Sequence, residues 1–282
     1  MEIFNQIKPL QTHLNQLGNN QKNIGLVPTM GALHAGHISL VKKALQENDY
    51  VVISIFVNPT QFNNANDLEK YPRTLDADVE KLKDISNDLV IFSPTVEEIY
   101  HQNVNAQHFD FDGLEFQMEG KFRTGHFDGV GTIVKRLFEI VQPAHAYFGE
   151  KDFQQLQIIK KMVAKENLPV QVIGCPILRE ENGLAMSSRN ERLSTEVRTK
   201  AAFIFKTLKE AQVKFDTKSA TQVKEWVSNQ FKKNKDFVLE YIEIADESTL
   251  KTITKKSNNK KYRAFIAVYA DDVRLIDNIA LN

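Results

Sequence analysis

The chain has 282 residues, and its 36 lysines and arginines balance its 36 aspartates and glutamates. This length suggests two domains, and the balanced charge argues against a nucleic-acid partner, because no basic excess is available to displace counterions. The one cysteine, Cys175, cannot form an intramolecular disulfide, the amino terminus lacks the features of a signal peptide, and no apolar run approaches the ~20 residues of a membrane helix. We therefore expect a soluble, cytoplasmic protein.

Strand and helix patterns alternate through residues 1–175. A short helix around Leu10 and Leu14, closed by Gly18 and a polar turn, precedes a buried strand that should stop at Pro28, because proline has no N–H to donate. A helix from near Gly36 and an apolar run at 50–57 complete a βαβ unit and predict a parallel sheet. Further helices are expected at 74–86, 126–141 and 151–167, and further strands at 89–92, 144–148 and 169–173. The alternation predicts a doubly wound α/β layer.

Beyond Pro176 the pattern changes to that of a second, smaller α+β unit. Two helices are expected at 195–214 and 220–233, followed by strands at 237–244 and 263–268. The polar loop KSNNKK between these strands is interpreted as a solvated hairpin tip. We place the domain boundary between residues 175 and 190 and take 1–175 and 176–282 as the two domains.

The stretch TMGALHAGH, residues 29–37, links the first buried strand to its helix. Gly31 and Gly36 allow a sharp turn and a close approach to a ligand, and the first N–H groups of the helix favour an anion. His34 and His37 would flank that anion. For an isolated pair of histidines we would favour the alternative that they only cap the helix. The stretch contains neither GxGxxG nor GxxxxGK[ST], so it is neither a dinucleotide fingerprint nor a P-loop.

Two further segments end predicted strands, where an open α/β sheet binds its ligands. In FVNPTQF, the neutral amide of Gln61 can orient a hydroxyl or a carboxylate, although an ordinary loop explains the same residues. In FGEKDFQQL, Lys151 could neutralise phosphate charge and Gln155 could reach a small substrate, with Asp152 as a helix cap. The alternative is a capped helix with an exposed lysine.

The segment LREENGLAMSSRN, residues 178–190, contains a glycine and no strong periodicity. Ser187 and Ser188 can donate hydrogen bonds to phosphates, and Arg189 offers a planar fork that matches phosphate oxygens. A plain helix cap by Ser188 is the competing interpretation. A loop of this kind can close on a nucleotide, as can the polar stretch 58–71.

Together these segments resemble the pantothenate synthetase (pantoate–β-alanine ligase) family of the HxGH nucleotidyltransferase superfamily. The resemblance runs in order from residue 27 to residue 192, through PTMGALHAGH, VNPTQF, YPRT, EGKFRTGHFDGV, FGEKDFQQL and GLAMSSRN. It implies a Rossmann-like domain with the ATP and pantoate sites, a smaller carboxy-terminal lid domain and a cytoplasmic homodimer. The implied reaction condenses pantoate with β-alanine to pantothenate through a pantoyl adenylate, with release of AMP and pyrophosphate.

The resemblance also implies a role for each matching residue. His37, His34, Lys151 and Arg189 would be catalytic, Gln61 would hold pantoate and β-alanine, and Gln155 would hold pantoate. ATP would contact Met30, Gly31, Ala32, Leu33, His34, Ala35, Gly36, His37, Gly149, Glu150, Lys151, Asp152, Leu178, Met186, Ser187, Ser188 and Arg189. The chain departs from the family pattern at Leu178, where valine is expected, and at Glu191 and Arg192, where an aromatic residue is common.

ATP is thus the implied co-substrate, and Mg²⁺ is implied with it. Asp76 and Asp78 could help to hold the metal, although a solvated helix face is the favoured interpretation of both. A class I aminoacyl-tRNA synthetase would share HxGH, but it needs a basic surface that this chain lacks. A nucleotidyltransferase that stops at the adenylate and a nucleotide sensor without catalysis remain as alternatives.

Overall fold

The chain divides into two structural units. Unit 1 comprises Met1–Glu115, Glu119–Glu150 and Gln155–Pro176, and unit 2 comprises Phe116–Met118, Lys151–Gln154 and Ile177–Asn282. The structure is a computed structural model that describes residues 1–18, 23–63 and 65–282, so the polar turn expected after Gly18 lies outside the described residues. Within the described part of the chain, no helix combines the length and apolar character needed to cross a membrane.

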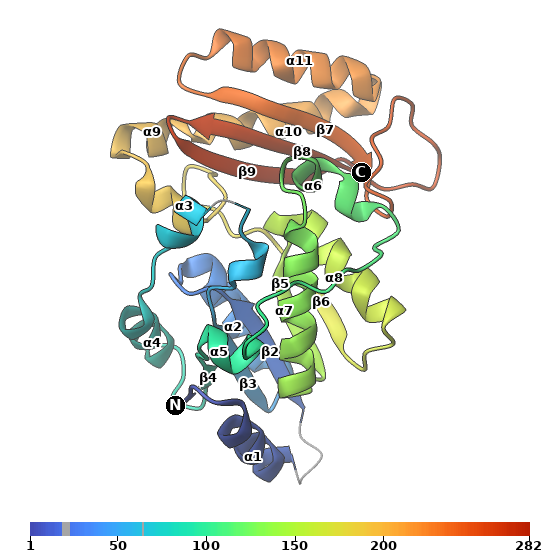
Figure 1. Cartoon of the computed structure of the whole chain (residues 1–282). Coiled ribbons are helices and arrows are strands. Elements are labelled where there is room, and N and C mark those ends of the chain that lie inside the picture. Colours follow the sequence, from blue (N-terminus) through green and yellow to red (C-terminus); the bar gives the residue numbers. More distant parts are fainter. Residues whose placement is uncertain (19–22, 64) are drawn as a thin grey trace. The chain divides into compact units, whose positions relative to one another are not determined.

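Unit 1 is built on a parallel sheet (Figure 1). Over the described residues the sheet has six strands in the order β1-β4-β3-β2-β5-β6. Its strands are β1 (Glu2–Phe4), β2 (Ile24–Thr29), β3 (Tyr50–Ile55), β4 (Val90–Phe92), β5 (His145–Gly149) and β6 (Gln171–Cys175). The near-continuous apolar runs of β3 and β4 are buried, as expected for strands covered on both faces. The doubly wound α/β prediction is confirmed.

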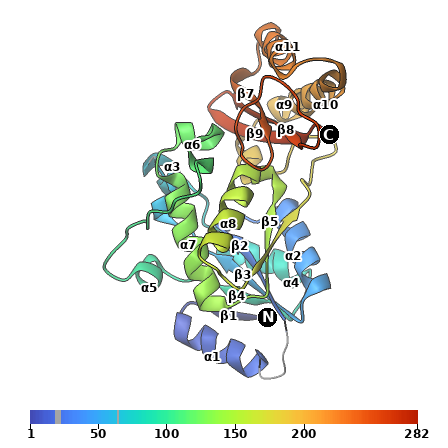
Figure 2. The same cartoon turned by 90° about the vertical axis from the view of Figure 1, so that its right-hand side faces the viewer.

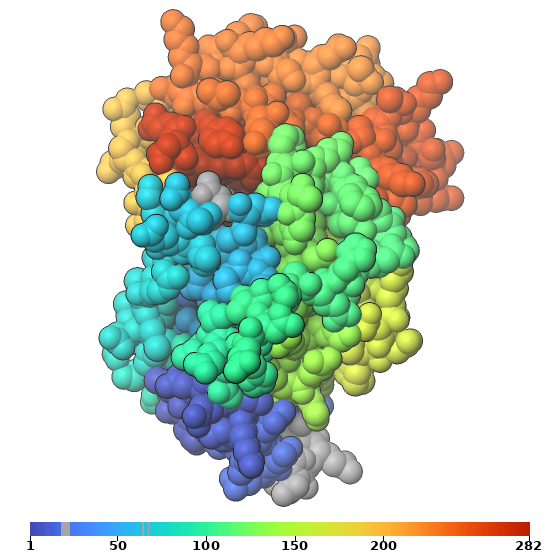
Figure 3. All heavy atoms as spheres, in the orientation of Figure 1, coloured from blue at the N-terminus to red at the C-terminus, as the bar shows by residue number. Residues whose placement is uncertain are grey.

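Helices cover both faces of the parallel sheet. Figure 2 shows α1 and α7 on one face and α2 and α4 on the other. The helices of this part of the chain are α1 (Ile7–Gly18), α2 (Ala35–Glu47), α3 (Ala65–Glu69), α4 (Leu75–Lys83), α5 (Val96–Tyr100), α6 (Met118–Phe122), α7 (His126–Val141) and α8 (Phe153–Lys165), with short 3₁₀ turns η1 (Pro59–Gln61), η2 (Leu114–Phe116) and η3 (Glu150–Asp152). Residues 101–108 are exposed, and the segment they begin runs over the surface of unit 1 in Figure 3.

Strand β2 was predicted to stop at Pro28, but it continues to Thr29. Pro28 pairs with Ser54 of β3, whereas the pairing of β2 with β5 is limited to Gly25 and Leu26. Proline is tolerated in this inner strand because no neighbouring strand on the β5 side requires its missing N–H. The Thr29 hydroxyl donates a 2.7 Å hydrogen bond to the Ser54 carbonyl and keeps the strand end in register.

Unit 2 contains an antiparallel sheet that is covered on one face by helices. Over the described residues this sheet has three strands in the order β7-β8-β9. The elements are η4 (Ser188–Arg192), α9 (Thr195–Lys200), α10 (Ala202–Thr217), α11 (Ala220–Lys233), β7 (Val238–Asp246), β8 (Tyr262–Ala270) and β9 (Val273–Ala280). Apolar residues of α10, α11 and the three strands form one core. The loop KSNNKK joins β7 to β8 and is exposed, which confirms the hairpin-tip interpretation.

The helix predicted at 195–214 is interrupted at Ala201. This residue keeps helical angles (φ −63°, ψ −12°), but its carbonyl accepts a 3.0 Å bond from the N–H of Ile204, three residues on. Such a bond tightens the turn to 3₁₀ geometry without breaking the direction of the chain. The predicted helix is therefore two helices, α9 and α10, in succession.

Cys175 lies at the end of β6, in the core between the parallel sheet and helices α2 and α4. Its side chain is 4% exposed. Burial raises the pKa of the thiol to about 11, so the thiol is protonated at neutral pH.

A buried carboxylate joins helix α4 to the turn that follows β2. Asp78 is fully buried, and its two oxygens accept hydrogen bonds from the N–H groups of Ala32 (2.9 Å) and Leu33 (2.7 Å). The Lys81 ammonium, one turn along α4, donates a 2.6 Å bond to the Leu33 carbonyl. The interpretation of Asp78 as part of a solvated helix face is therefore wrong, whereas Asp76 is exposed as expected.

We predict that Asp78→Asn lowers the free energy of unfolding by about 2 kcal/mol, because the new amide group turns a donor toward a buried N–H that needs an acceptor. Urea denaturation followed by circular dichroism measures the change. Asp76→Asn on the same helix is the matched control and should change the free energy by less than about 0.5 kcal/mol. Equal denaturation midpoints for the two variants would show that the carboxylate is dispensable.

Candidate active site

The turn between β2 and α2 has the strand–loop–helix form predicted from the sequence. Gly31 (φ 81°) and Ala32 (φ 50°) both occupy the left-handed region. A Cβ on Gly31 would also be crowded by Asp78 Oδ2 at 3.2 Å and Ile55 Cγ2 at 3.1 Å, so glycine is favoured here by conformation and by space. The strained turn ends at the buried Leu33, and the chain then enters α2.

The two histidines form a capping box at the start of α2. His34 is the N-cap residue, and its Nδ1 accepts a hydrogen bond from the N–H of Gly36 at 3.1 Å. The Nδ1 of His37 accepts from the N–H of His34 at 3.4 Å, and the two rings lie 4.0 Å apart between centroids. The two histidines therefore do cap helix α2, as the alternative interpretation predicted. Because both Nδ1 atoms act as acceptors, each neutral imidazole carries its proton on Nε2.

Gln61 lies in η1, directly after β3, and its amide is held by neighbours. Its Nε2 approaches the sulfur of Met30 at 2.9 Å, and its Oε1 accepts from Asn58 Nδ2 at 3.2 Å. The Gln61 carbonyl contacts His126 Nδ1, at the start of α7, at 2.8 Å. A Cβ on Gly129 of α7 would lie 2.2 Å from the Thr60 carbonyl oxygen, so glycine allows α7 to approach η1 this closely. The structure thus brings the predicted residues Met30 and Gln61 into contact.

Asn58 and Tyr100 support Gln61 and were not among the predicted site residues. Asn58 is 1% exposed, donates to the Gly129 carbonyl at 3.1 Å, and accepts a 2.6 Å bond from the Tyr100 hydroxyl. Burial raises the pKa of Tyr100, which keeps its phenol as a donor. A sequence signal existed for Asn58, a polar residue directly after a buried strand, but none marked Tyr100, which lies 42 residues away.

Lys151 and Asp152 occupy the 3₁₀ turn η3, whereas the sequence predicted that the helix would begin at Lys151. Their side chains lie 3.7 Å apart between Lys151 Nζ and Asp152 Oδ1. The Lys151 side chain is 18% exposed, so most of its stem is packed and its ammonium is placed rather than free to sweep through solvent. Gln155 follows in the first turn of α8 and is partly buried.

The segment that ends at Arg189 folds as a small hairpin followed by a 3₁₀ turn. Arg179 and Ala185 pair as an antiparallel bridge, and the N–H of Met186 donates to the Leu178 carbonyl at 3.0 Å. The cap of η4 is Ser187, which accepts from the N–H of Arg189 at 3.3 Å, and not Ser188 as the alternative interpretation proposed. Leu178, at the residue where the family pattern has valine, is 39% exposed.

The predicted site residues divide between the two units. Unit 1 contains Met30–His37, Gln61, Gly149, Glu150 and Gln155, and unit 2 contains Lys151, Asp152, Leu178 and Met186–Arg189. Across the described residues, no group of three or more His, Cys, Asp or Glu side chains could hold a metal ion. The Asp78 carboxylate accepts from backbone N–H groups, as described above, and Asp76 lies on the exposed side of α4.

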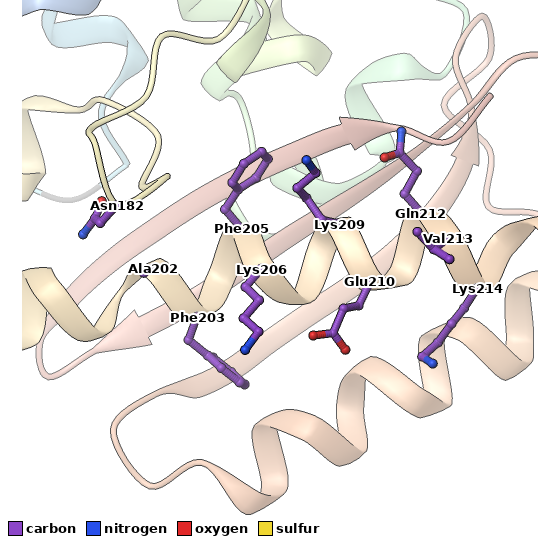
Figure 4. A pocket seen from close by; sticks show the side chains of 10 residues that line it. All are labelled: Asn182, Ala202, Phe203, Phe205, Lys206, Lys209, Glu210, Gln212, Val213 and Lys214. Atoms are coloured by element: carbon purple, nitrogen blue, oxygen red, sulfur yellow. The ribbon is translucent and has the colours of Figure 1, made fainter.

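A hollow of about 840 Å³ lies along α10 in unit 2 and contains none of the predicted site residues. Figure 4 shows that its lining side chains project to both sides of the helix, Phe205 and Lys209 to one side and Lys206 and Glu210 to the other. The hollow is therefore an open depression of the surface along α10 and not an enclosed ligand pocket.

Known proteins match this chain over its full length. The family model described as pantoate–beta-alanine ligase matches residues 2–280. The pantothenate synthetase of Flavobacterium psychrophilum is 59% identical over 281 residues, which cover the whole of both chains. The pantothenate synthetase structure from Thermus thermophilus has a TM-score of 0.89 at 37% identity, covering 100% of this chain and 99% of that one.

A second solved structure was obtained with ligands. The pantoate–beta-alanine ligase of Francisella tularensis, described as complexed with beta-gamma ATP and beta-alanine, has a TM-score of 0.83 at 38% identity and covers 100% of this chain and 98% of its own. The resemblance inferred from the sequence motifs is confirmed: the chain belongs to the pantoate–beta-alanine ligase family.

Proposed function

We propose that this chain is an ATP-dependent ligase that condenses pantoate with β-alanine to pantothenate, with release of AMP and pyrophosphate. The full-length family match supports the reaction. The structural observation that carries it is the turn from Met30 to His37, where a strand end, the start of α2 and two imidazoles with Nε2 protons come together. Donors fixed in this way before substrate binds suit the charge of a phosphate group.

The reaction needs two steps because a carboxylate is a poor acyl donor until one of its oxygens belongs to a good leaving group. The pantoate carboxylate attacks the α-phosphorus of ATP, and the bond to pyrophosphate breaks. The amine of β-alanine then attacks the acyl carbon of the pantoyl adenylate, and AMP leaves with the former carboxylate oxygen. His34 and His37 donate through Nε2 to phosphate oxygens as negative charge moves onto them.

The two glutamines suit the binding of the acid. Gln61 is a neutral amide whose position is fixed by Asn58, so it can orient the pantoate carboxylate and the β-alanine without withdrawing the charge that makes the carboxylate nucleophilic. Gln155, in the first turn of α8, binds pantoate. A lysine in place of Gln61 would hold the acid more tightly and slow its attack.

Unit 2 supplies the cationic and hydroxyl groups for the phosphates. Lys151, Ser187, Ser188 and Arg189 follow the charge onto the leaving pyrophosphate. Mg²⁺ enters with ATP, because this ion is usually held by substrate phosphates and by one or two carboxylates at most. Unit 2 acts as a lid that protects the adenylate from water, and the enzyme works as a cytoplasmic homodimer with small-molecule substrates.

Isotope labelling tests the adenylate route. Incubation with carboxyl-¹⁸O-labelled pantoate, ATP and β-alanine should place one labelled oxygen in AMP, because the attacking oxygen leaves with the phosphate. Mass spectrometry of the nucleotide products measures this transfer. Label found only in pyrophosphate or inorganic phosphate would rule the route out, and full turnover without β-alanine would identify an enzyme that stops at the adenylate.

We predict that His37→Gln lowers the rate of pyrophosphate release by about 100- to 1000-fold, the loss expected for one preorganised donor. Glutamine at this position can still accept from the N–H of His34, so the capping box is retained while the imidazole is lost. His34→Asn, which keeps an N-cap side chain, should also weaken ATP binding. Near-normal rates in His37→Gln with an unchanged circular dichroism spectrum would show that His37 serves only as a cap.

We predict that Gln61→Ala and Gln155→Ala raise the KM for pantoate by roughly 10- to 100-fold, the loss expected for one hydrogen bond to a charged group, and leave the KM for ATP nearly unchanged. Steady-state kinetics with each substrate varied in turn measures both constants. Gln157→Ala, on the same helix as Gln155, is the matched control. Normal pantoate affinity by calorimetry in the two variants would place the acid elsewhere.

A further inference from the structure

Strand β9 contains a buried polar pair that the proposed reaction does not use directly. Asp277 is 5% exposed and Asn278 is 2% exposed, although neighbouring residues of a strand ordinarily face opposite sides of a sheet. Arg263 of β8, which contacts Asn278, is 7% exposed. Burial of polar groups costs free energy unless they are hydrogen-bonded. The hydrogen-bond partners of Asp277 and Asn278 therefore show which segments these residues hold in place.

Asn278 holds the backbone of η3. Its Nδ2 donates to the Lys151 carbonyl at 2.9 Å, and its Oδ1 accepts from Arg263 Nη1 at 2.6 Å. The Arg263 guanidinium lies over the ring of Phe153, 3.9 Å from its centroid, and its Nε donates to Glu247 at 2.8 Å. The segment that carries Lys151 is thus held at two points, the Lys151 carbonyl and the ring of Phe153.

Asp277 holds the hairpin that leads to Ser187. Its carboxylate makes a two-point ion pair with Arg179, at 2.6 Å to Nη1 and 3.0 Å to Nη2. The same guanidinium donates to the Gly183 carbonyl at 3.1 Å and stacks 3.6 Å from the centre of the Phe205 ring. Arg179 lies in the first arm of the hairpin, and Gly183 ends its turn, where the Gly183 N–H donates to the Glu180 carbonyl at 2.8 Å. This single side chain therefore ties both the arm and the turn to β9.

We propose that Asp277 and Asn278 are positioning residues, which hold the Lys151 segment and the hairpin before Met186–Arg189 at a fixed spacing so that the phosphate-binding groups of unit 2 act as one body. The inference rests on the proposed function for the roles of Lys151 and Arg189. A buried ion pair adds little stability over apolar residues of the same size, but here the two-point contact with Asp277 fixes the orientation of the Arg179 guanidinium. Because Asp277 and Asn278 are adjacent in β9, the Lys151 segment and the hairpin are held by neighbouring residues of one strand.

Pyrophosphate release, the first half of the reaction, should depend on β9 more than the attack of β-alanine does. Lys151 and Arg189 must follow charge onto two phosphates at once during pyrophosphate release, so a change in their spacing slows this step. Attack of β-alanine on the pantoyl adenylate involves one phosphate only and is less sensitive. A defect that merely loosened the fold would slow both half-reactions together.

Asn278→Asp is the primary test, because it keeps the acceptor for Arg263 and replaces only the donor to the Lys151 carbonyl with a repelling oxygen. We expect pyrophosphate release to slow by about ten-fold or more. The KM for pantoate and the aminolysis of supplied pantoyl adenylate should be unchanged. Asp272→Asn, which removes an exposed ion pair with Arg192 just before β9, is the matched control and should behave as wild type. Equal slowing of both half-reactions, or none, would overturn the proposal.

A double variant separates positioning from stability. Arg179→Met with Asp277→Leu replaces both partners of the ion pair by apolar residues, so neither partner is left as an unpaired buried charge. We expect a folded protein whose pyrophosphate release is still slow, and recovery of the wild-type rate would overturn the role of Asp277. Asn278→Asp decides the question alone if the double variant does not fold.

Calorimetric titration with ATP distinguishes failure of this inference from failure of the proposed function. If the wild-type protein forms no pantothenate, the proposed function is contradicted, and ATP binding becomes the test of the inference. In that case weaker ATP binding in Asn278→Asp than in Asp272→Asn would still support β9 as the element that positions the phosphate-binding groups, and equal binding would overturn it.

Discussion

The turn that follows β2 depends on one buried carboxylate. Its residues Gly31 and Ala32 adopt a left-handed conformation outside any helix or strand. Asp78 accepts from the N–H groups of Ala32 and Leu33, and Lys81 donates to the Leu33 carbonyl. Buried backbone groups need hydrogen-bond partners, and here side chains of helix α4 provide the partners that regular secondary structure does not. The orientation of His34 and His37 at the start of α2 follows from it.

Much of the secondary structure was predictable because it follows from local periodicity. Helices α7 and α11 begin and end at the predicted residues, since each has a continuous apolar stripe, and α11 also begins with a capping box. Strands β1 and β9 were not predicted. Strand β1 is only three residues long, and β9 has Asp277 and Asn278 in its interior, where a pattern of alternating apolar residues would be needed. Strand β1 also depends on a partner distant in the sequence, because it pairs with β4 from Glu2 to Val90, whereas β9 pairs with the preceding strand β8 across a short turn.

The site was predictable where its chemistry is concentrated in short motifs. The relation of His34 and His37, and the placement of Gln61 at a strand end, followed from spacing. The supporting residues were not predictable in the same way, because Asn58, Tyr100 and Asp78 act through contacts with other elements. Asp78 illustrates the limit: its sequence context is that of an exposed, acidic helix start, and only tertiary packing turns the side chain inward.

The buried thiol of Cys175 can report on local opening of unit 1. The sequence contains a single cysteine, the last residue of β6, and its thiol is protonated and buried in the folded state. Alkylating reagents act on the thiolate, so they can modify this protein only when that edge of the parallel sheet separates from its covering helices. The rate of modification therefore measures local opening of unit 1, without any added label or engineered residue.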